Sequence, residues 1–490
     1  MTIPPLPASV AISDTRAAGY PAEPPFDPPE RYPELPSDLW HLDPDNVVYA
    51  GVRRALMLLG LDAGRFGTPA WNPLGEIILP GDRVVVKPNL VRHFHGDGRS
   101  LESLVTHGSV TRAVLDYVVI ALQGKGEIVV GDSPLQYADL ASALAASGTD
   151  RVLKEVSSYA GVPLRAVDFR KERSEKRGGV IVSRVANAGD PEGYRVVDLH
   201  EASRFSGLDE SRMRRFRVTQ YHPATMRNAH GPGRHAYLFP ATVLRSDVVI
   251  NLPKLKTHRK AGVTACMKNL VGVNGSKDWL PHHAAGAPPA GDEYLRPSVR
   301  KKLMSSLRDR IEGLRSPLLR RSLKAVDRAV RATGRIRPFP DPYWEGSWHG
   351  NDTLWRMVHD LHRVLFHADA TGVLRPEPVR RYFALVDAVV AGEGEGPMRP
   401  SPRPTGLLLA GFNPVAVDLV CCRLMGFDER KVPLVREALG REGIPGLVSA
   451  ADVRLATNEP RWEALFELTR PGTLEFRPPA GWAGAIELLP

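Results

Sequence analysis

The chain has 490 residues, of which 43% are apolar and 7% aromatic, so it can bury a large core as one α/β body or two coupled lobes. Its net charge is +10, but residues 296–337 alone hold fourteen Lys and Arg against three Asp and Glu, which leaves 51 basic and 52 acidic residues elsewhere. One segment therefore carries the whole imbalance, and the rest of the chain is nearly neutral.

Residues 1–45 are predicted to form a proline-rich N-terminal arm. Met1–Trp40 contains ten prolines and no basic stretch followed by an apolar one, which is typical of an extended arm and not of a signal peptide. Apolar stretches such as Val47–Leu61 are interrupted by Arg or Gly well before the roughly 18–20 residues that span a bilayer. We therefore expect no membrane span and a cytoplasmic location.

Residues 46–170 are predicted to form a first α/β lobe. Runs rich in Val, Ile and Leu alternate with segments whose apolar residues recur every three or four positions. Near-continuous apolar strands that alternate with helices indicate a parallel sheet covered on both faces. The predicted strands are Arg83–Lys87, Glu127–Val130 and Leu164–Val167, and the predicted helices begin near Ser109 and span Ala138–Ser147 and Arg151–Ala160.

The regular pattern weakens over residues 171–245, where charged loops and short strand candidates such as Tyr194–Leu199 predict a smaller mixed lobe. It returns over residues 339–458, predicted to form a second α/β portion, and residues 459–490 form a C-terminal tail. The expected fold class is α/β with a mostly parallel, doubly wound sheet. The later predicted elements are strands at Asp247–Asn251, Phe383–Val390 and Gly406–Ala410, and a helix that begins near Pro414 and ends at Gly426.

Residues 296–338 are predicted to form a basic helical hairpin inserted in the α/β body. Two apolar helical faces lie on either side of Pro317, made by Leu303, Leu307, Ile311 and Leu314 and by Leu319, Leu323, Val326 and Val330. The hairpin is either a solvated cover over the core or a docking surface for a protein partner, an acidic membrane or nucleic acid. Nucleic acid is the weakest alternative, because no aromatic residues alternate with the basic ones over Arg296–Arg337.

Polar residues gather where the predicted strands end, and residues 246–295 are the richest in lysine and histidine. Ligands bind beyond the carboxyl ends of strands in open α/β sheets, and lysines that meet there need an anion or acidic groups to offset their repulsion. The candidate ligand-binding residues are Lys87, Asn89, Asp132, Ser133, Lys254, Lys256, Asn269, Asn274, His282 and His283. The candidate catalytic residues are His258 and His107, as proton carriers, and Lys268, as a stabiliser of negative charge.

Each of these residues also has an ordinary structural interpretation. The lysines could form a salt-bridged loop, and His107 could simply cap a helix. The histidines near Trp279 lack the helical spacing of a zinc site, which favours hydrogen-bonded packing over metal ligation. A divalent ion needs only one or two carboxylates when its ligand brings phosphate, but carboxylates also offset lysines and cap helices. The candidate metal ligands are Asp387, Glu393 and Asp418.

Several motifs carry a resemblance to a known family. They are Lys87–Asn89, Asp247–His258, Thr264–Asn274, Ala391–Glu393 and Asn413–Asp418. At these positions the chain resembles the family called domain of unknown function 362, and Asp278–His283, Gly291–Tyr294 and Asn351–Arg356 resemble a cytoplasmic bacterial branch of it. Some similar proteins carry ferredoxin-like cysteine clusters, which implies redox chemistry for them. The three cysteines here, Cys266, Cys421 and Cys422, are too few and too poorly spaced, so no iron–sulfur cluster is expected in this chain.

Together these features predict an enzyme that acts on a small phosphorylated or carboxylated metabolite by lysine and histidine acid–base chemistry. Lys87, Lys254 and Lys256 would hold the anion, and the carboxylates would seat a divalent ion or the hydroxyl groups of the ligand. One alternative is a redox-associated subunit that uses a borrowed cofactor or the cluster of a partner. The other is a non-catalytic binding protein that acts through the basic hairpin.

Overall fold

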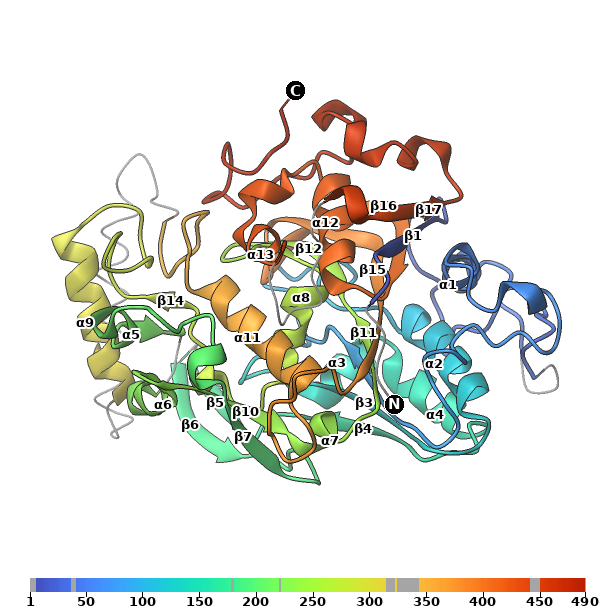
Figure 1. Cartoon of the computed structure of the whole chain (residues 1–490), viewed down its shortest axis with the longest axis horizontal. Helices are drawn as coiled ribbons and strands as arrows, with labels where there is room; N and C mark the ends of the chain where they lie inside the picture. Colours follow the sequence, from blue (N-terminus) through green and yellow to red (C-terminus); the bar gives the residue numbers. More distant parts are fainter. Residues whose placement is uncertain are drawn as a thin grey trace.

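The structure is a computed structural model that describes residues 6–36, 41–177, 180–219, 222–313, 322–323, 343–440 and 450–489. Within these residues a ten-stranded sheet runs through the centre of the molecule (Figure 1). Its strands are β1 (Ser9–Asp14), β2 (Arg83–Pro88), β3 (Glu127–Asp132), β4 (Leu164–Asp168), β11 (Val248–Leu252), β12 (Lys254–His258), β13 (Gly262–Thr264), β15 (Arg381–Glu395), β16 (Arg399–Gly411) and β17 (Arg454–Thr457). The main order is β17-β1-β16-β15-β11-β2-β3-β4, and β12 joins β15 to β13.

Most pairs of strands in this sheet are parallel, including the run from β15 through β11, β2 and β3 to β4. Strand β16 is antiparallel to both of its neighbours. Alternate residues of one strand enter two different cores, because successive side chains of a strand point to opposite faces. Val84 and Val86 belong to one core and Val85 to the other. This arrangement confirms the predicted α/β fold with a mostly parallel sheet.

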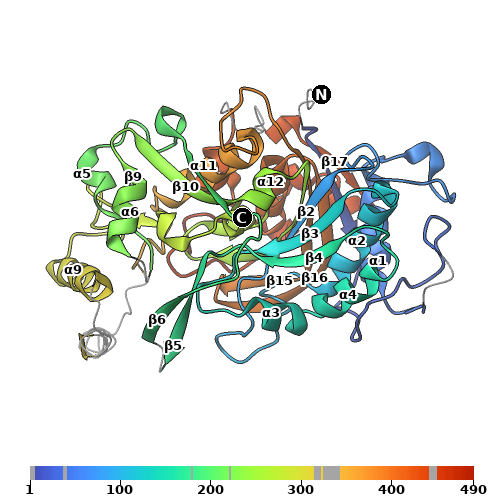
Figure 2. The same ribbon diagram turned by 90° about the horizontal axis from the view of Figure 1, so that it is seen from below.

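Helices cover both faces of the sheet (Figure 2). One face is covered by α1 (Val47–Leu58), α2 (Gly108–Leu122), α3 (Leu140–Ala146) and α4 (Thr149–Ser157). The other face is covered by α8 (Cys266–Asn269), α11 (Leu354–His367), α12 (Pro414–Leu424) and α13 (Pro433–Arg436). No helix in the described parts of the chain is long and apolar enough to cross a membrane.

The smaller lobe lies beside the main sheet and is built from short elements (Figure 1). One sheet has three strands, in the order β7 (Tyr194–Asp198), β10 (Arg234–Pro240) and β9 (His230–Gly231). Two further sheets have two strands each: β5 (Glu172–Arg177) with β6 (Val180–Ala186), and β8 (Phe216–Arg217) with β14 (His283–Ala284). Its helices are α5 (Glu210–Met213), α6 (Pro223–Ala229) and α7 (Ala241–Leu244). Helix α9 (Val299–Gly313) begins the predicted basic hairpin, whose remainder, residues 322–323 excepted, lies outside the described residues.

Two segments differ from the sequence-based predictions. Part of the predicted N-terminal arm is strand β1, which lies inside the sheet between β16 and β17, with Val10 and Ile12 fully buried. The segment Lys254–His258, expected to be a loop, is strand β12, which pairs in parallel with β15. In both cases the strand forms because its backbone hydrogen-bonds to a strand that is distant in the chain. Local sequence patterns do not reveal such pairing.

Buried histidines predict a stability that falls in acid. Burial lowers the pKa of each to about 3 or about 4, so they stay neutral in the folded protein but become protonated on unfolding below about pH 6.5. They are His107, His230 and His359, at about 3, and His235 and His362, at about 4. Their contribution is therefore present above the ordinary histidine pKa and is lost as the pH falls toward these lowered values.

Two buried carboxyls oppose this effect. Burial raises the pKa of Asp360 to about 6 and that of Asp418 to about 7, so the folded state holds these two protons more tightly. These five histidines and two carboxyls together take up about three protons on unfolding, so these seven groups by themselves lower the stability by about 4 kcal/mol per pH unit between about pH 6 and 4. Urea unfolding at several pH values measures this slope. A midpoint that stays constant over this range would show that the five rings are not buried as described.

Candidate functional site

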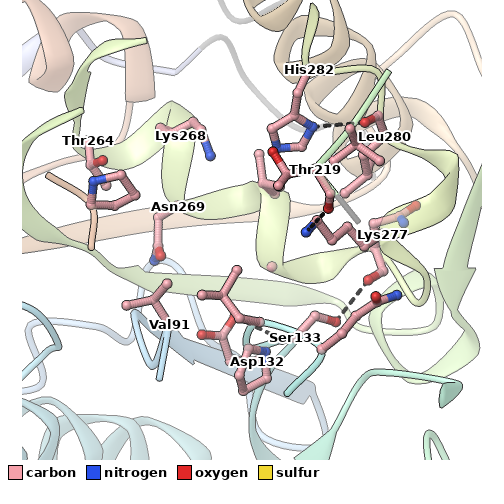
Figure 3. A pocket seen from close by; sticks show the side chains of 18 of the residues that line it. Val91, Asp132, Ser133, Thr219, Thr264, Lys268, Asn269, Lys277, Leu280 and His282 are labelled. Atoms are coloured by element: carbon pink, nitrogen blue, oxygen red, sulfur yellow. Dashed lines mark hydrogen bonds between the residues drawn. The ribbon is translucent and has the colours of Figure 1, made fainter. Parts of the chain in front are cut away.

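A cavity of about 400 Å³ lies beyond the carboxyl ends of β2 and β3 (Figure 3). Lys87 lies at the end of β2 and Asn89 just after it, and Asp132 and Ser133 lie likewise at the end of β3. Strand β12 provides Lys256 and His258. Figure 3 shows Lys268 and Asn269 on one wall and His282 and Leu280 on the facing wall. The structure thus brings ten predicted site residues to one cavity: Lys87, Asn89, Asp132, Ser133, Lys256, His258, Lys268, Asn269, Asn274 and His282.

The floor of the cavity is a buried network of lysines and amides. The Lys87 ammonium lies 2.8 Å from a carboxylate oxygen of Asp132 and donates to the side-chain oxygen of Asn269 at 3.1 Å. The Lys256 ammonium donates to the side-chain oxygen of Asn89 at 2.8 Å, and the Asn89 amide donates to Asn269 at 2.6 Å. Burial lowers the pKa of Lys87 and, further, of Lys256. These partners fix the two lysine side chains in place.

The Lys87–Asp132 pair requires a glycine beside it. The Gly272 backbone passes so close that an added Cβ would overlap the Asp132 carboxylate and the Lys87 ammonium. The Gly272 carbonyl also accepts a hydrogen bond from the Ser133 backbone N–H at 2.8 Å. A glycine is needed here because the 3-10 helical turn after α8, Leu270–Val273, must touch the ends of β2 and β3 directly.

Lys268 differs from the other lysines of the cavity in its surroundings. It lies on α8, whose first two backbone N–H groups, of Cys266 and Met267, donate to Asp418 at 2.6 and 3.0 Å. Its ammonium has no hydrogen-bond or ion-pair partner among the described residues. Burial, followed by the nearby charges of Lys87 and Lys260, lowers the pKa of Lys268 to about 7. At neutral pH it therefore divides between a free amine and an unpaired cation.

The two histidines of the cavity have opposite hydrogen-bonding roles. The Nδ1 atom of His258 accepts from the backbone N–H groups of Lys260 and Ala261 at 3.0 and 3.1 Å, so the proton of the neutral ring is on Nε2. The Nδ1 atom of His282 donates to the Leu280 carbonyl at 2.8 Å, so its Nε2 carries a lone pair. Burial and the neighbouring lysines lower the pKa of both rings well below 6.5. One ring thus offers a donor and the other an acceptor.

The cavity lining is strongly positive. Seven basic and three acidic side chains line it, which leaves four formal positive charges. The basic residues are Lys87, Arg170, Lys256, Arg259, Lys260, Lys268 and Lys277, and the acidic residues are Asp132, Glu172 and Glu345. Such an excess in a concave site favours an anionic ligand.

Two predicted residues, His107 and Lys254, lie outside this cavity, in a separate buried cluster. The Lys254 ammonium is fully buried 2.6 Å from the Asp387 carboxylate, and the Tyr20 hydroxyl also donates to Asp387, at 2.5 Å. The His107 ring stacks on Tyr20 with ring centroids 4.1 Å apart, and its Nδ1 caps α2. The N-terminal segment therefore covers both residues, and we reassign them to a structural network.

The three predicted metal ligands do not meet. Asp387 binds Lys254, Glu393 accepts from the Arg477 backbone N–H at 3.0 Å, and Asp418 caps α8. Each carboxylate is engaged in a different place, because β15 is long enough to carry Asp387 and Glu393 far from each other. Among the described residues no three His, Cys, Asp or Glu side chains are grouped to hold a metal ion. His283 is buried in β14, opposite Arg217 of β8, and does not line the cavity.

The structure adds cavity residues that sequence reasoning missed. Lys260 continues the lysine and histidine segment and could have been included for that reason. Thr219 comes from the smaller lobe and carries no sequence signal. The side-chain oxygens of Gln136 and Thr264 are buried at the cavity and have no hydrogen-bond partner among the described residues. Such oxygens are rarely left unpaired, which points to polar groups on a ligand.

The family comparison covers the part of the chain that forms the cavity. The model of the family described as domain of unknown function (DUF362) matches residues 84–190 and 195–423. The chain belongs to the DUF362 family. Every lining residue of the cavity falls within the two matched DUF362 ranges. The three cysteines of this DUF362 protein are buried and free, with Cys266 at the start of α8 and the other two within α12.

Other comparisons add little to the family assignment. No curated protein matches the chain. One similar solved structure is the crystal structure of a Thermotoga maritima protein from a structural genomics consortium, with 11% sequence identity and a TM-score of 0.29. The alignment covers 76% of this DUF362 chain and 58% of that protein, so the chain spans little more than half of its length.

Proposed function

We propose that this DUF362 protein is an enzyme that binds a small phosphorylated or carboxylated metabolite in the cavity and transforms it by acid–base chemistry. The observation that carries the proposal is the unpaired Lys268 ammonium, which lies between other cations in a cavity with an excess of positive charge. An isolated, partly buried cation destabilises the fold, so its presence is best explained by an anionic ligand that completes the site.

The two histidines supply the acid–base part of the proposal. A neutral His258 offers the Nε2 proton to a carbonyl or hydroxyl oxygen, where it would stabilise developing negative charge. His282 offers the Nε2 lone pair to a proton of the substrate. Bound anionic charge would offset the field of Lys260 and Lys268, which lowers the pKa of His282, and would make this ring a stronger base.

The pH dependence of anion binding tests this proposal. We use sulfate as the probe, because its charge does not change between about pH 6 and 8. With the pKa of Lys268 at about 7, the cationic fraction rises about tenfold between about pH 8 and pH 6, and the affinity should rise by the same factor. Isothermal titration calorimetry in two buffers of different ionisation enthalpy measures both the affinity and the proton taken up on binding.

The variant Lys268→Met provides the matched control for the pH experiment. It should bind sulfate weakly at every pH and without proton uptake, because the two cavity histidines remain neutral throughout this range. No sulfate binding to the native chain at any pH would contradict the anion site, and an affinity independent of pH would contradict the role of Lys268.

A further inference from the structure

Lys268 differs from every other lysine that lines the cavity. Its amine nitrogen has no partner among the described residues, whereas each of the others is held. Thr219 alone holds two of them, through its hydroxyl and its carbonyl. The held lysines and their partners are Lys87 with Asp132, Lys256 with Asn89, and Lys260 and Lys277 with Thr219.

We propose that Lys268 is a nucleophile that forms a Schiff base with the carbonyl carbon of an anionic aldehyde or ketone bound in the cavity. This inference rests on the proposed anion site and adds the substrate class, since a carbonyl compound is the partner that a free amine requires. The cations around the amine would bind the anionic group of the same molecule and bring its carbonyl carbon within reach of Lys268.

The surroundings of Lys268 suit an amine nucleophile. Burial together with the charges of Lys87 and Lys260 keeps much of the nitrogen unprotonated at neutral pH. Apolar side chains, including Val91, Val271 and Leu280, also contribute to the cavity lining. Apolar groups near an imine limit the access of water and slow its hydrolysis.

The two histidines can assist the reaction step. The lone pair of the Lys268 nitrogen forms a C–N bond while the carbonyl π electrons move to oxygen, which His258 stabilises by donating a hydrogen bond. His282 carries the two hydrogens of the nitrogen to that oxygen, one after the other. The C–O bond then breaks and the oxygen leaves as one water molecule, so that C=N replaces C=O with no oxidant or reductant.

Borohydride trapping tests the inference on the full-length protein. Pyridoxal 5′-phosphate, which carries both an aldehyde and a phosphate, serves as the chemical probe, and pyridoxine 5′-phosphate, an alcohol in place of the aldehyde, serves as the non-reacting analogue. We expect reduction of the first mixture to attach the probe to Lys268, as located by peptide mass spectrometry. Lys268→Met should lose this adduct, and Lys154→Met, at an exposed position of α4, should keep it.

The outcomes separate the inference from the function on which it rests. If both compounds bind and Lys268 is labelled well before the held lysines, the inference is supported. Binding of both compounds without an adduct on Lys268, or with equal labelling of Lys260 and Lys277, overturns the nucleophile but leaves the anion site intact. If neither compound binds, the anion site fails as well. Melting temperatures of both variants show that any loss of adduct does not come from unfolding.

Discussion

Lys268→Met is expected to weaken anion binding strongly and at the same time to stabilise the fold. The sulfate affinity should fall about 30- to 100-fold, because the substitution removes a charge-assisted contact. The unfolding free energy should rise by about 1 kcal/mol, because a partly buried cation beside Lys87 and Lys260 is replaced by an apolar side chain of similar length. Calorimetry and urea unfolding at about pH 7 measure the two effects.

The opposite signs of the two effects make this prediction specific. A lysine that serves only the fold would lower stability when it is removed, so a destabilised Lys268→Met variant would contradict the proposed role. Lys268→Arg is the second variant to compare. It keeps the charge but has no accessible amine form, so it should retain sulfate binding and lose the borohydride-trapped adduct.

Lys254→Met, unlike Lys268→Met, should destabilise the protein, by about 3–5 kcal/mol. The substitution leaves the fully buried Asp387 carboxylate without its cation. The chain would keep two donors to this carboxylate, the Tyr20 hydroxyl and the His107 backbone N–H. Sulfate affinity should change little at a temperature where the variant is folded, since Lys254 does not line the cavity. Thermal unfolding and calorimetry on the same sample measure both quantities.

The double variant Lys254→Met with Asp387→Asn controls for the unpaired charge that the single variant leaves on Asp387. Asparagine carries no charge, and its side-chain oxygen can still accept from the His107 backbone N–H while its amide group donates to the Tyr20 hydroxyl oxygen. The double variant should therefore recover a good part of the lost stability. If Lys254→Met instead weakens sulfate binding and leaves the melting temperature unchanged, then Lys254 belongs to the ligand site, as its sequence position suggested.

The sequence predicted the central strands well, because their pattern is set by local composition. The run Arg83–Lys87 is apolar at every central position, as a strand covered on both faces must be, and it became β2. The strand β1 could not be found in this way. Its six residues follow a proline-rich segment, and their burial depends on β16, which is distant in the chain.

The candidate site was predictable to the extent that strand ends converge. Lys87 and Asp132 end neighbouring parallel strands, and both line the cavity. The different positions of Lys254 and Lys256 were not predictable, since residues two apart in a regular strand point to the same face. The pairing of β12 with β15 is irregular between them, so Lys254 faces the buried Asp387 and Lys256 the cavity.

The position of β1 has a consequence for the order in which the chain is synthesised. A ribosome releases residues 9–14 long before their partner β16, residues 399–411. The other neighbour, β17, follows later still, and within the described residues it pairs with β1 alone. The apolar segment Val10–Ile12 therefore stays unpaired during translation, and unpaired strand edges are prone to aggregate at that stage. In the nascent chain, chaperone contacts would matter most at this segment.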